Sequence, residues 1–223
     1  MRQFGVMVKD KDGDVMATYY IVRHGETLAN RGGILQGHLD VSLSELGKHQ
    51  AELAGKALSK YRMDAIYSSD LDRTKETAKS IAKYQTCQLI LDPRLREIHC
   101  GDMEGKTMRE SRQLYPEFFL AFEKDALNAI RPGGGESIQN LYDRVSQAFK
   151  DIVNAHRDPS SNVVIVSHGG AIRCLLAYAA GIKVDPQSPA ARNTSISTVS
   201  QAGDKLIVDV FDDVAHLSDP RSS

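Results

Sequence analysis

The chain has 223 residues, a formal net charge of −1 and 41% hydrophobic residues. This length suits one α/β domain with a substantial core, and the near-neutral charge gives no indication that nucleic acid or an anionic membrane is a partner. No apolar stretch approaches the ~20 residues that span a bilayer, and the start of the chain is too polar for a secretory signal.

The three cysteines, Cys87, Cys100 and Cys174, are scattered along the chain and odd in number. No C-x-x-C pair is present, so neither a disulfide framework nor a cysteine metal site is predicted. We therefore expect reduced thiols in a cytoplasmic protein. The sequence leaves open whether the chain forms a homodimer.

Strands and helices alternate along most of the chain. From residue 18 onward we expect strands at 18–23, 64–68, 87–91, 163–166, 194–200 and 205–211, and helices at 44–61, 71–84, 136–156 and 170–180. This alternation predicts an α/β fold with a mostly parallel central sheet and helices on both of its faces.

The helix predicted at 44–61 follows a loop of about twenty residues. Ser42 and Glu45 have the spacing of a capping box at its start. Apolar residues at helical spacing predict the buried face of this helix; they are Leu46, Leu53, Ala54, Ala57 and Leu58.

The chain is predicted to divide into an extension, a main domain and a tail. Residues 1–17 form the N-terminal extension, because charged side chains surround a glycine turn signal there. The main domain covers 18–217, and residues 218–223 are the C-terminal tail. Within the domain, a long segment without strands is predicted to form a small helical cap at about 98–135.

Four aromatic residues of this segment fall on one helical face; they are Tyr115, Phe118, Phe119 and Phe122. We expect them to anchor the cap to the rest of the domain. The alternative is that one or two of them line a pocket for a bulky or apolar ester.

Two of the predicted strands end in a His-Gly pair. The first strand leads to His24-Gly25, and the strand at 163–166 leads to His168-Gly169. Open α/β sheets bind ligands at the carboxyl ends of their strands, so the two imidazoles are expected to lie side by side there. His24 is the candidate nucleophile for phosphate. His168 is expected to balance phosphate charge as an imidazolium, and Gly169 allows the backbone to come close.

Arginine is expected to hold the phosphoryl oxygens, because its planar guanidinium binds two oxygens at once. Arg23 directly precedes His24 and is the first candidate. Arg73 lies in the first turn of the helix predicted at 71–84, where its charge opposes the helix dipole. An arginine kept at a position that the helix dipole disfavours indicates a role other than stabilising the helix.

Phosphoryl transfer to an imidazole also needs an acid for the leaving oxygen. Glu97 is the preferred candidate, and Asp102 and Glu104 in the same loop are its competitors. The sequence pattern by itself does not choose among the three carboxylates.

Together these motifs resemble the histidine phosphatase superfamily, the group related to cofactor-dependent phosphoglycerate mutase. The resemblance covers nearly everything from residue 18 to residue 217, and it implies a phosphoglycerate mutase-like fold. The segments that carry it are Arg23-His24-Gly25-Glu26-Thr27, Asn30, Gln36-Gly37, Ser68-Ser69-Asp70-Leu71, Arg73-Thr74, Thr77-Ala78, Leu95, Glu97, Glu104-Gly105, Gly134-Gly135-Glu136-Ser137 and Val166-Ser167-His168-Gly169-Gly170.

The resemblance implies that His24 becomes transiently phosphorylated. It implies that Glu97 first protonates the leaving oxygen and then activates water. The residues implied to bind the phosphoryl group and substrate are Arg23, Asn30, Gln36, Gly37, Arg73, His168 and Gly169. Neither a metal nor a cofactor is implied.

Three hypotheses for the function differ in class. The stretch between Glu97 and His168 is shorter than in the resembling mutases, which favours a phosphomonoesterase acting on a small phosphorylated metabolite. A phosphoglycerate mutase is the alternative. A non-catalytic phospho-ligand or protein-binding module is disfavoured, because every reactive group is present.

Two other kinds of phosphate chemistry are not supported. Cys-x5-Arg and Gly-Lys-Ser/Thr motifs do not occur, so neither a cysteine phosphatase nor an NTPase is supported.

Overall fold

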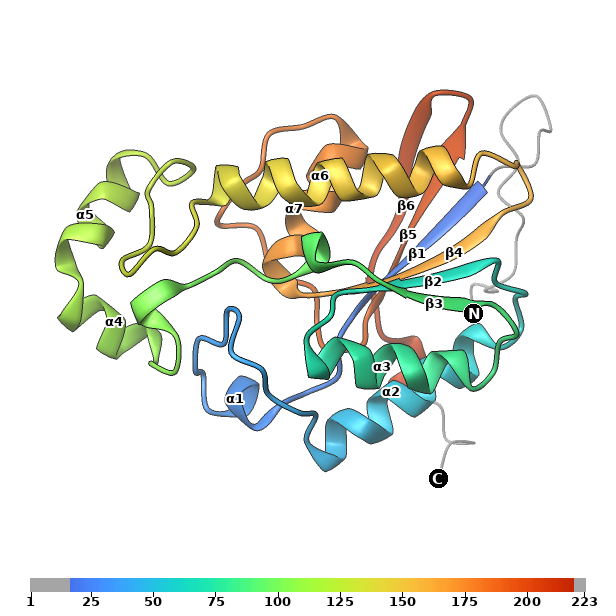
Figure 1. Ribbon diagram of the computed structural model, residues 1–223, viewed down its shortest axis with the longest axis horizontal. Helices are drawn as coiled ribbons and strands as arrows, with labels where there is room; N and C mark the ends of the chain where they lie inside the picture. The colour runs from blue at the N-terminus through green and yellow to red at the C-terminus, as the bar shows by residue number, and fades with distance from the viewer. Residues whose placement is uncertain (1–16, 219–223) are drawn as a thin grey trace.

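The computed structural model describes residues 17–218, which form one sheet with helices around it (Figure 1). The strands are β1 (Ala17–Arg23), β2 (Ala65–Ser68), β3 (Gln88–Leu91), β4 (Asn162–Ser167), β5 (Ile196–Ala202) and β6 (Lys205–Asp213). The helices are α1 (Leu28–Arg31), α2 (Glu45–Leu58), α3 (Asp72–Ala82), α4 (Met108–Leu114), α5 (Pro116–Lys124), α6 (Ile138–Ala155) and α7 (Gly169–Ala180). Every strand and helix predicted by residue range is present, with ends within three residues of the prediction.

The sheet is mostly parallel, as predicted. Its strand order is β3-β2-β4-β1-β5-β6. The first four strands of this order run parallel, whereas β5 and β6 are antiparallel to their neighbours. The two strands that precede the His-Gly pairs, β1 and β4, are therefore direct neighbours at the centre of the sheet.

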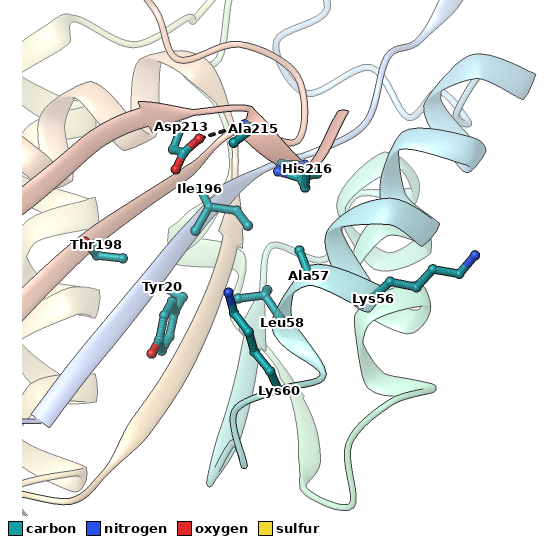
Figure 2. Close-up of a pocket in the computed structure, with 10 residues that line it drawn as sticks. All are labelled: Tyr20, Lys56, Ala57, Leu58, Lys60, Ile196, Thr198, Asp213, Ala215 and His216. Atoms are coloured by element: carbon teal, nitrogen blue, oxygen red, sulfur yellow. Dashed lines mark hydrogen bonds between the residues drawn. The ribbon is translucent and has the colours of Figure 1, made fainter. Parts of the chain in front are cut away.

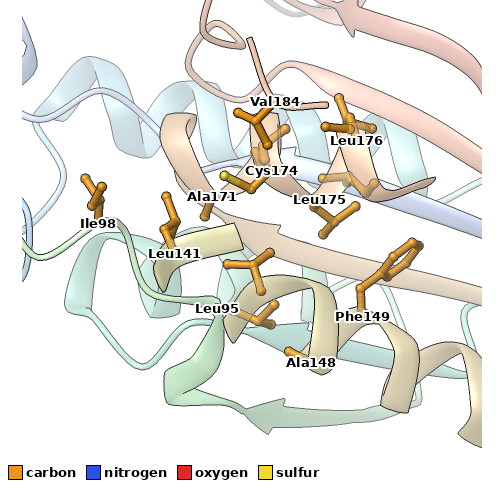
Figure 3. Packing of buried hydrophobic residues seen from close by; sticks show 14 of the residues in the cluster. Leu95, Ile98, Leu141, Ala148, Phe149, Ala171, Cys174, Leu175, Leu176 and Val184 are labelled. Atoms are coloured by element: carbon orange, nitrogen blue, oxygen red, sulfur yellow. The ribbon is translucent and has the colours of Figure 1, made fainter. Parts of the chain in front are cut away.

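Helices cover both faces of the sheet, because successive side chains of the central strands point in opposite directions. In Figure 1, α2 and α3 lie below the sheet and α6 and α7 lie above it. Tyr20 and Val22 of β1 pack with the first pair of helices, whereas Tyr19 and Ile21 pack with the second pair. Figure 3 shows how Phe149 and its neighbours fill the larger core between the sheet and α6 and α7.

The start of α2 differs from the prediction. Ser44 is the N-cap residue, and its side-chain oxygen accepts an N–H of the first turn at 3.0 Å, so the capping box at Ser42 and Glu45 is wrong. Ser44 Oγ also donates to Glu26 Oε1 at 2.9 Å, a contact that depends on how the preceding loop folds. Leu46 is 45% exposed and does not belong to the buried face. The predicted loop also contains the single turn α1.

The predicted cap segment contains α4 and α5, which lie beyond the carboxyl ends of the central strands at the left of Figure 1. Phe118 and Phe119 are each 9% exposed and belong to the larger core, and Tyr115 and Phe122 pack against it. The prediction that these aromatic residues anchor the segment is confirmed. Lining of a pocket for a bulky ester finds no support in this packing.

Two further predictions concern the N-terminal extension and membrane-spanning segments. The predicted extension lies outside the described residues except for Ala17, which begins β1. Within residues 17–218, none of the helices has both the length and the apolar character that crossing a bilayer requires.

Candidate active site

The register between β1 and β4 brings two histidines together. Arg23 pairs with Ser167, so the next residue of each strand end is a histidine. The His24 N–H donates to the Ser167 carbonyl at 3.0 Å, and the ring centroids of His24 and His168 are 5.1 Å apart. Both rings are buried, with 2% and 0% exposure. The predicted pairing of the two imidazoles at one sheet edge is thus what the fold produces.

Hydrogen bonds define which nitrogen of each ring carries a proton. His24 Nδ1 lies 2.8 Å from the Gly25 carbonyl, which can only accept, so this nitrogen is protonated and Nε2 keeps its lone pair. Arg73 Nε donates to His168 Nδ1 at 3.2 Å, so His168 Nε2 carries the proton and donates to Ser69 Oγ at 2.9 Å. His168 is therefore a neutral imidazole. The expectation of an imidazolium is wrong, because Arg73 already supplies a charge on that side of the ring.

The surroundings of both rings favour their neutral forms. Burial lowers the pKa of His24 and of His168 well below the ordinary value of 6.5. The positive charges of Arg23 and Arg73 lower both pKa values further. A neutral His24 retains a nucleophilic nitrogen at neutral pH.

We expect the free energy of unfolding to decrease as the pH falls below 6.5, the ordinary pKa of histidine. Unfolded His24 takes up a proton in this range, whereas the folded ring does not, so the stability contributed by its neutral form is complete above pH 6.5 and is lost below it. The loss should be about 1 kcal/mol per buried ring over the first pH unit. Urea unfolding should show that His24→Asn loses about 1 kcal/mol less than the wild type over this interval. Equal losses would contradict the neutral assignment.

Arg73 is the largest of the fully buried side chains, with 1% exposure. From the first turn of α3, its Nη1 donates to the Leu39 carbonyl and its Nη2 to the Gly37 carbonyl, both at 2.8 Å. Burial lowers the pKa of Arg73 to about 10, so the guanidinium stays charged at neutral pH. Arg73 thus connects the loop after α1 to the His168 ring.

Arg23 has an N–H group that no atom of the described residues accepts. Its Nη1 donates to the Ala191 carbonyl at 2.6 Å, whereas its buried Nε has no partner among the described residues. A methyl group built on Gly169 would lie 3.6 Å from Arg23 Cζ, so the guanidinium lies directly against the second His-Gly turn. This geometry leaves a guanidinium N–H without an acceptor among the described residues, beside the second His-Gly turn.

The three candidate acids occupy different places. Glu97 Oε2 accepts the Gly170 N–H at 3.0 Å, which puts this carboxylate beside the turn that carries His168. Glu104 Oε1 instead accepts backbone N–H groups of the adjoining loops, including that of His38 at 2.7 Å. The Asp102 carboxylate lies against Gly133, where an added methyl group would come within 2.1 Å of Asp102 Oδ1. Of the three, Glu97 is the carboxylate that the fold brings to the second His-Gly turn.

The remaining predicted site residues belong to the loop around α1. Asn30 Oδ1 accepts the Thr27 N–H at 3.1 Å as part of a capping box, and Gln36 Oε1 contacts Thr27 Oγ1 at 3.1 Å. Gly37 has a φ of +49°, and a side chain there would come within 2.1 Å of Glu104 Oε1. Glycine is therefore required where this loop passes Glu104.

Two residues of the site were not singled out as candidates from the sequence. Asn193 Nδ2 donates to the His24 carbonyl at 2.9 Å and approaches Asn30 Oδ1 at 3.3 Å. Ser69 Oγ accepts the hydrogen bond that His168 Nε2 donates. Ser69 follows β2 directly and could have been recognised as a polar residue at a strand end. Asn193 lies in an irregular segment before β5, and only the pairing of β5 with β1 brings it to His24.

A separate pocket lies on the α2 side of the sheet (Figure 2). Its lining residues are Tyr20, Lys56, Ala57, Leu58, Lys60, Ile196, Thr198, Asp213, Ala215 and His216. None of the predicted site residues lines it, so it has no part in the site described above.

Comparison with known proteins gives consistent matches over most of the chain. The family model described as histidine phosphatase superfamily (branch 1) matches residues 19–214. Phosphoglycerate mutase-like protein 4 of Arabidopsis thaliana is 39% identical over 91% of this chain and 88% of its own, and the metal-independent phosphoserine phosphatase of the same plant is 37% identical over 89% and 82%. The solved structure of a mycobacterial glucosyl-3-phosphoglycerate phosphatase has a TM-score of 0.79 and 33% identity, covering 89% of this chain and all of its own.

Proposed function

Because the chain belongs to branch 1 of the histidine phosphatase superfamily, we propose that it is a metal-independent phosphomonoesterase. It acts through a phosphohistidine on a small phosphorylated metabolite. The observation that carries this proposal is the pair of neutral, buried imidazoles of His24 and His168, flanked by two arginines and by the Glu97 carboxylate. Relatives named for phosphoserine and glucosyl-3-phosphoglycerate phosphatase activity support the substrate class.

In the first step, His24 Nε2 attacks the phosphorus atom, because this nitrogen keeps its lone pair while Nδ1 donates to Gly25. A phosphorus–nitrogen bond forms as the ester oxygen–phosphorus bond breaks. Arg23 and Arg73 stabilise the negative charge on the phosphoryl oxygens, and the His168 ring lies beside the group. Glu97 gives a proton to the leaving oxygen, so the alcohol departs neutral.

In the second step, the Glu97 carboxylate takes a proton from a water molecule whose oxygen attacks the phosphorus atom. The phosphorus–nitrogen bond breaks, inorganic phosphate leaves, and His24 recovers its neutral ring. Asn30, Gln36, Gly37 and Gly169 border the phosphoryl group in this scheme. No step needs a metal ion, because guanidinium groups neutralise the phosphoryl charge.

The test is release of phosphate in excess EDTA from a panel of esters: p-nitrophenyl phosphate, phosphoserine, phosphoglycerates, sugar phosphates and nucleoside monophosphates. We expect EDTA-insensitive release from at least one ester, and the panel ranks the substrates by kcat/KM. Release that EDTA abolishes, or no release from any ester, would contradict the proposal.

A phosphoglycerate mutase is a second candidate, because one relative is named phosphoglycerate mutase-like and another a probable phosphoglycerate mutase. Isotopic phosphate would then move between carbon atoms of phosphoglycerate faster than it reaches solvent. We also propose a cytoplasmic location, which the three unpaired cysteines support.

A further inference from the structure

The Gly-Gly-Glu-Ser motif at 134–137 takes no part in the chemistry proposed above, yet its glutamate makes a specific contact. Glu136 forms a two-point ion pair with Arg144 of α6: Arg144 Nε donates to Oε1 at 2.9 Å and Nη2 donates to Oε2 at 2.7 Å. The two side chains are only 20% and 22% exposed. A planar, partly buried pair of this kind has a fixed geometry and can hold other groups in place.

Arg144 uses its remaining donors on the backbone that carries Glu97. Its Nη1 donates to the carbonyls of Arg94 at 2.9 Å and Arg96 at 3.0 Å, and its Nη2 lies 3.2 Å from the carbonyl of Glu97 itself. One guanidinium of α6 thus binds three carbonyls of a segment that lies outside the strands and α-helices.

Glu136 holds the same segment on the other side of Glu97. Its Oε2 accepts the His99 N–H at 2.9 Å, and its own N–H donates to the His99 carbonyl at 2.9 Å. The backbone is therefore held before, at and after Glu97 by one pair of charged residues.

We propose that Arg144 and Glu136 are positioning residues that hold the Glu97 carboxylate against the second His-Gly turn; this inference rests on the acid role proposed for Glu97. The carboxylate itself is held by two backbone donors, the N–H of Ile98 at 2.9 Å and that of Gly170 at 3.0 Å. The first of these belongs to the segment that Arg144 and Glu136 hold. A shift of about 1 Å in that segment would misplace the acid and cost about 100-fold in rate.

The test compares two esters that differ in their need for an acid. Phosphoserine has an alkyl leaving group that must be protonated, whereas p-nitrophenolate leaves readily without a proton. The measured quantity is kcat/KM, which reports the steps up to phosphoryl transfer to His24. Glu97→Gln is the reference and should lose about 100-fold or more with phosphoserine and much less with p-nitrophenyl phosphate.

Arg144→Gln should show the same selectivity, losing about 10- to 100-fold with phosphoserine and only a few-fold with p-nitrophenyl phosphate. Arg144→Gln combined with Glu97→Gln should lose no more than Glu97→Gln alone, because both act through one group. Arg94→Gln is the matched control. Arg94 also links this segment to α6, through Asp151 at 2.5 Å, but its side chain holds none of the three carbonyls, so both rates should stay within about two-fold of wild type.

Each outcome decides one proposal. Equal losses of Arg144→Gln with both esters, or rates like those of Arg94→Gln, would overturn the positioning role while the acid role stands. A Glu97→Gln variant without leaving-group selectivity would overturn the acid role and this inference with it. If Arg144→Gln does not fold, Glu136→Gln carries the test, because it keeps an oxygen for His99 and removes the charge opposite Arg144; its loss should show the same selectivity.

Discussion

Replacing His24 with alanine should lower kcat for phosphate release by at least about 10⁴-fold, because the substitution removes the nitrogen that is proposed to attack phosphorus. The neighbouring ring of His168 has its Nδ1 occupied by Arg73 and its Nε2 by a proton donated to Ser69, so it offers no lone pair. The measurement is phosphate release in EDTA with the substrate that the panel ranks first.

His49→Ala is the matched control for that variant. His49 is an exposed histidine on α2, and the same substitution there should leave kcat within about two-fold. A rapid alkaline quench during turnover should also trap phosphorus on the wild-type chain and none on His24→Ala. Activity of His24→Ala near the wild-type level would reject a phosphohistidine at this position.

Replacing Arg73 with glutamine should damage both catalysis and stability. The loss of a guanidinium that is proposed to stabilise the phosphoryl group should cost about 100- to 1,000-fold in kcat/KM. The substitution also leaves the buried carbonyls of Gly37 and Leu39 without their donor, which should lower the free energy of unfolding by about 3 kcal/mol. Kinetics and urea unfolding of one preparation measure the two effects.

Arg23→Gln separates these two contributions. Among the described residues, Arg23 has one acceptor, the Ala191 carbonyl, and its buried Nε has none. We therefore expect a loss of kcat/KM comparable to that of Arg73→Gln, with a change in stability of about 1 kcal/mol or less. A large loss of stability in Arg23→Gln, or none in Arg73→Gln, would contradict this division of roles.

The sequence was sufficient for the strands, for the helices α2, α3, α6 and α7, and for most of the proposed site. Strand ends carry local signals: an apolar run followed by His-Gly at residue 24 and again at residue 168 predicts the place of both rings. The anchoring role of the aromatic residues in α5 also followed from local spacing. Local patterns failed at the start of α2, where Ser44 caps the helix in contact with Glu26, 18 positions away.

Contacts between distant parts of the chain decided the rest. The neutral state of His168 depends on Arg73, 95 positions away, and the choice of Glu97 over Glu104 depends on Gly170, 73 positions from Glu97. Asn193 binds the His24 carbonyl although the two residues are 169 positions apart in the sequence. Arg144 contacts the Glu97 carbonyl from 47 positions away. Residue types and local spacing thus determined which groups this chain has for phosphate chemistry. The tertiary structure decided the protonation and the orientation of these groups, because both depend on hydrogen-bond partners that only the packed fold brings within about 3 Å.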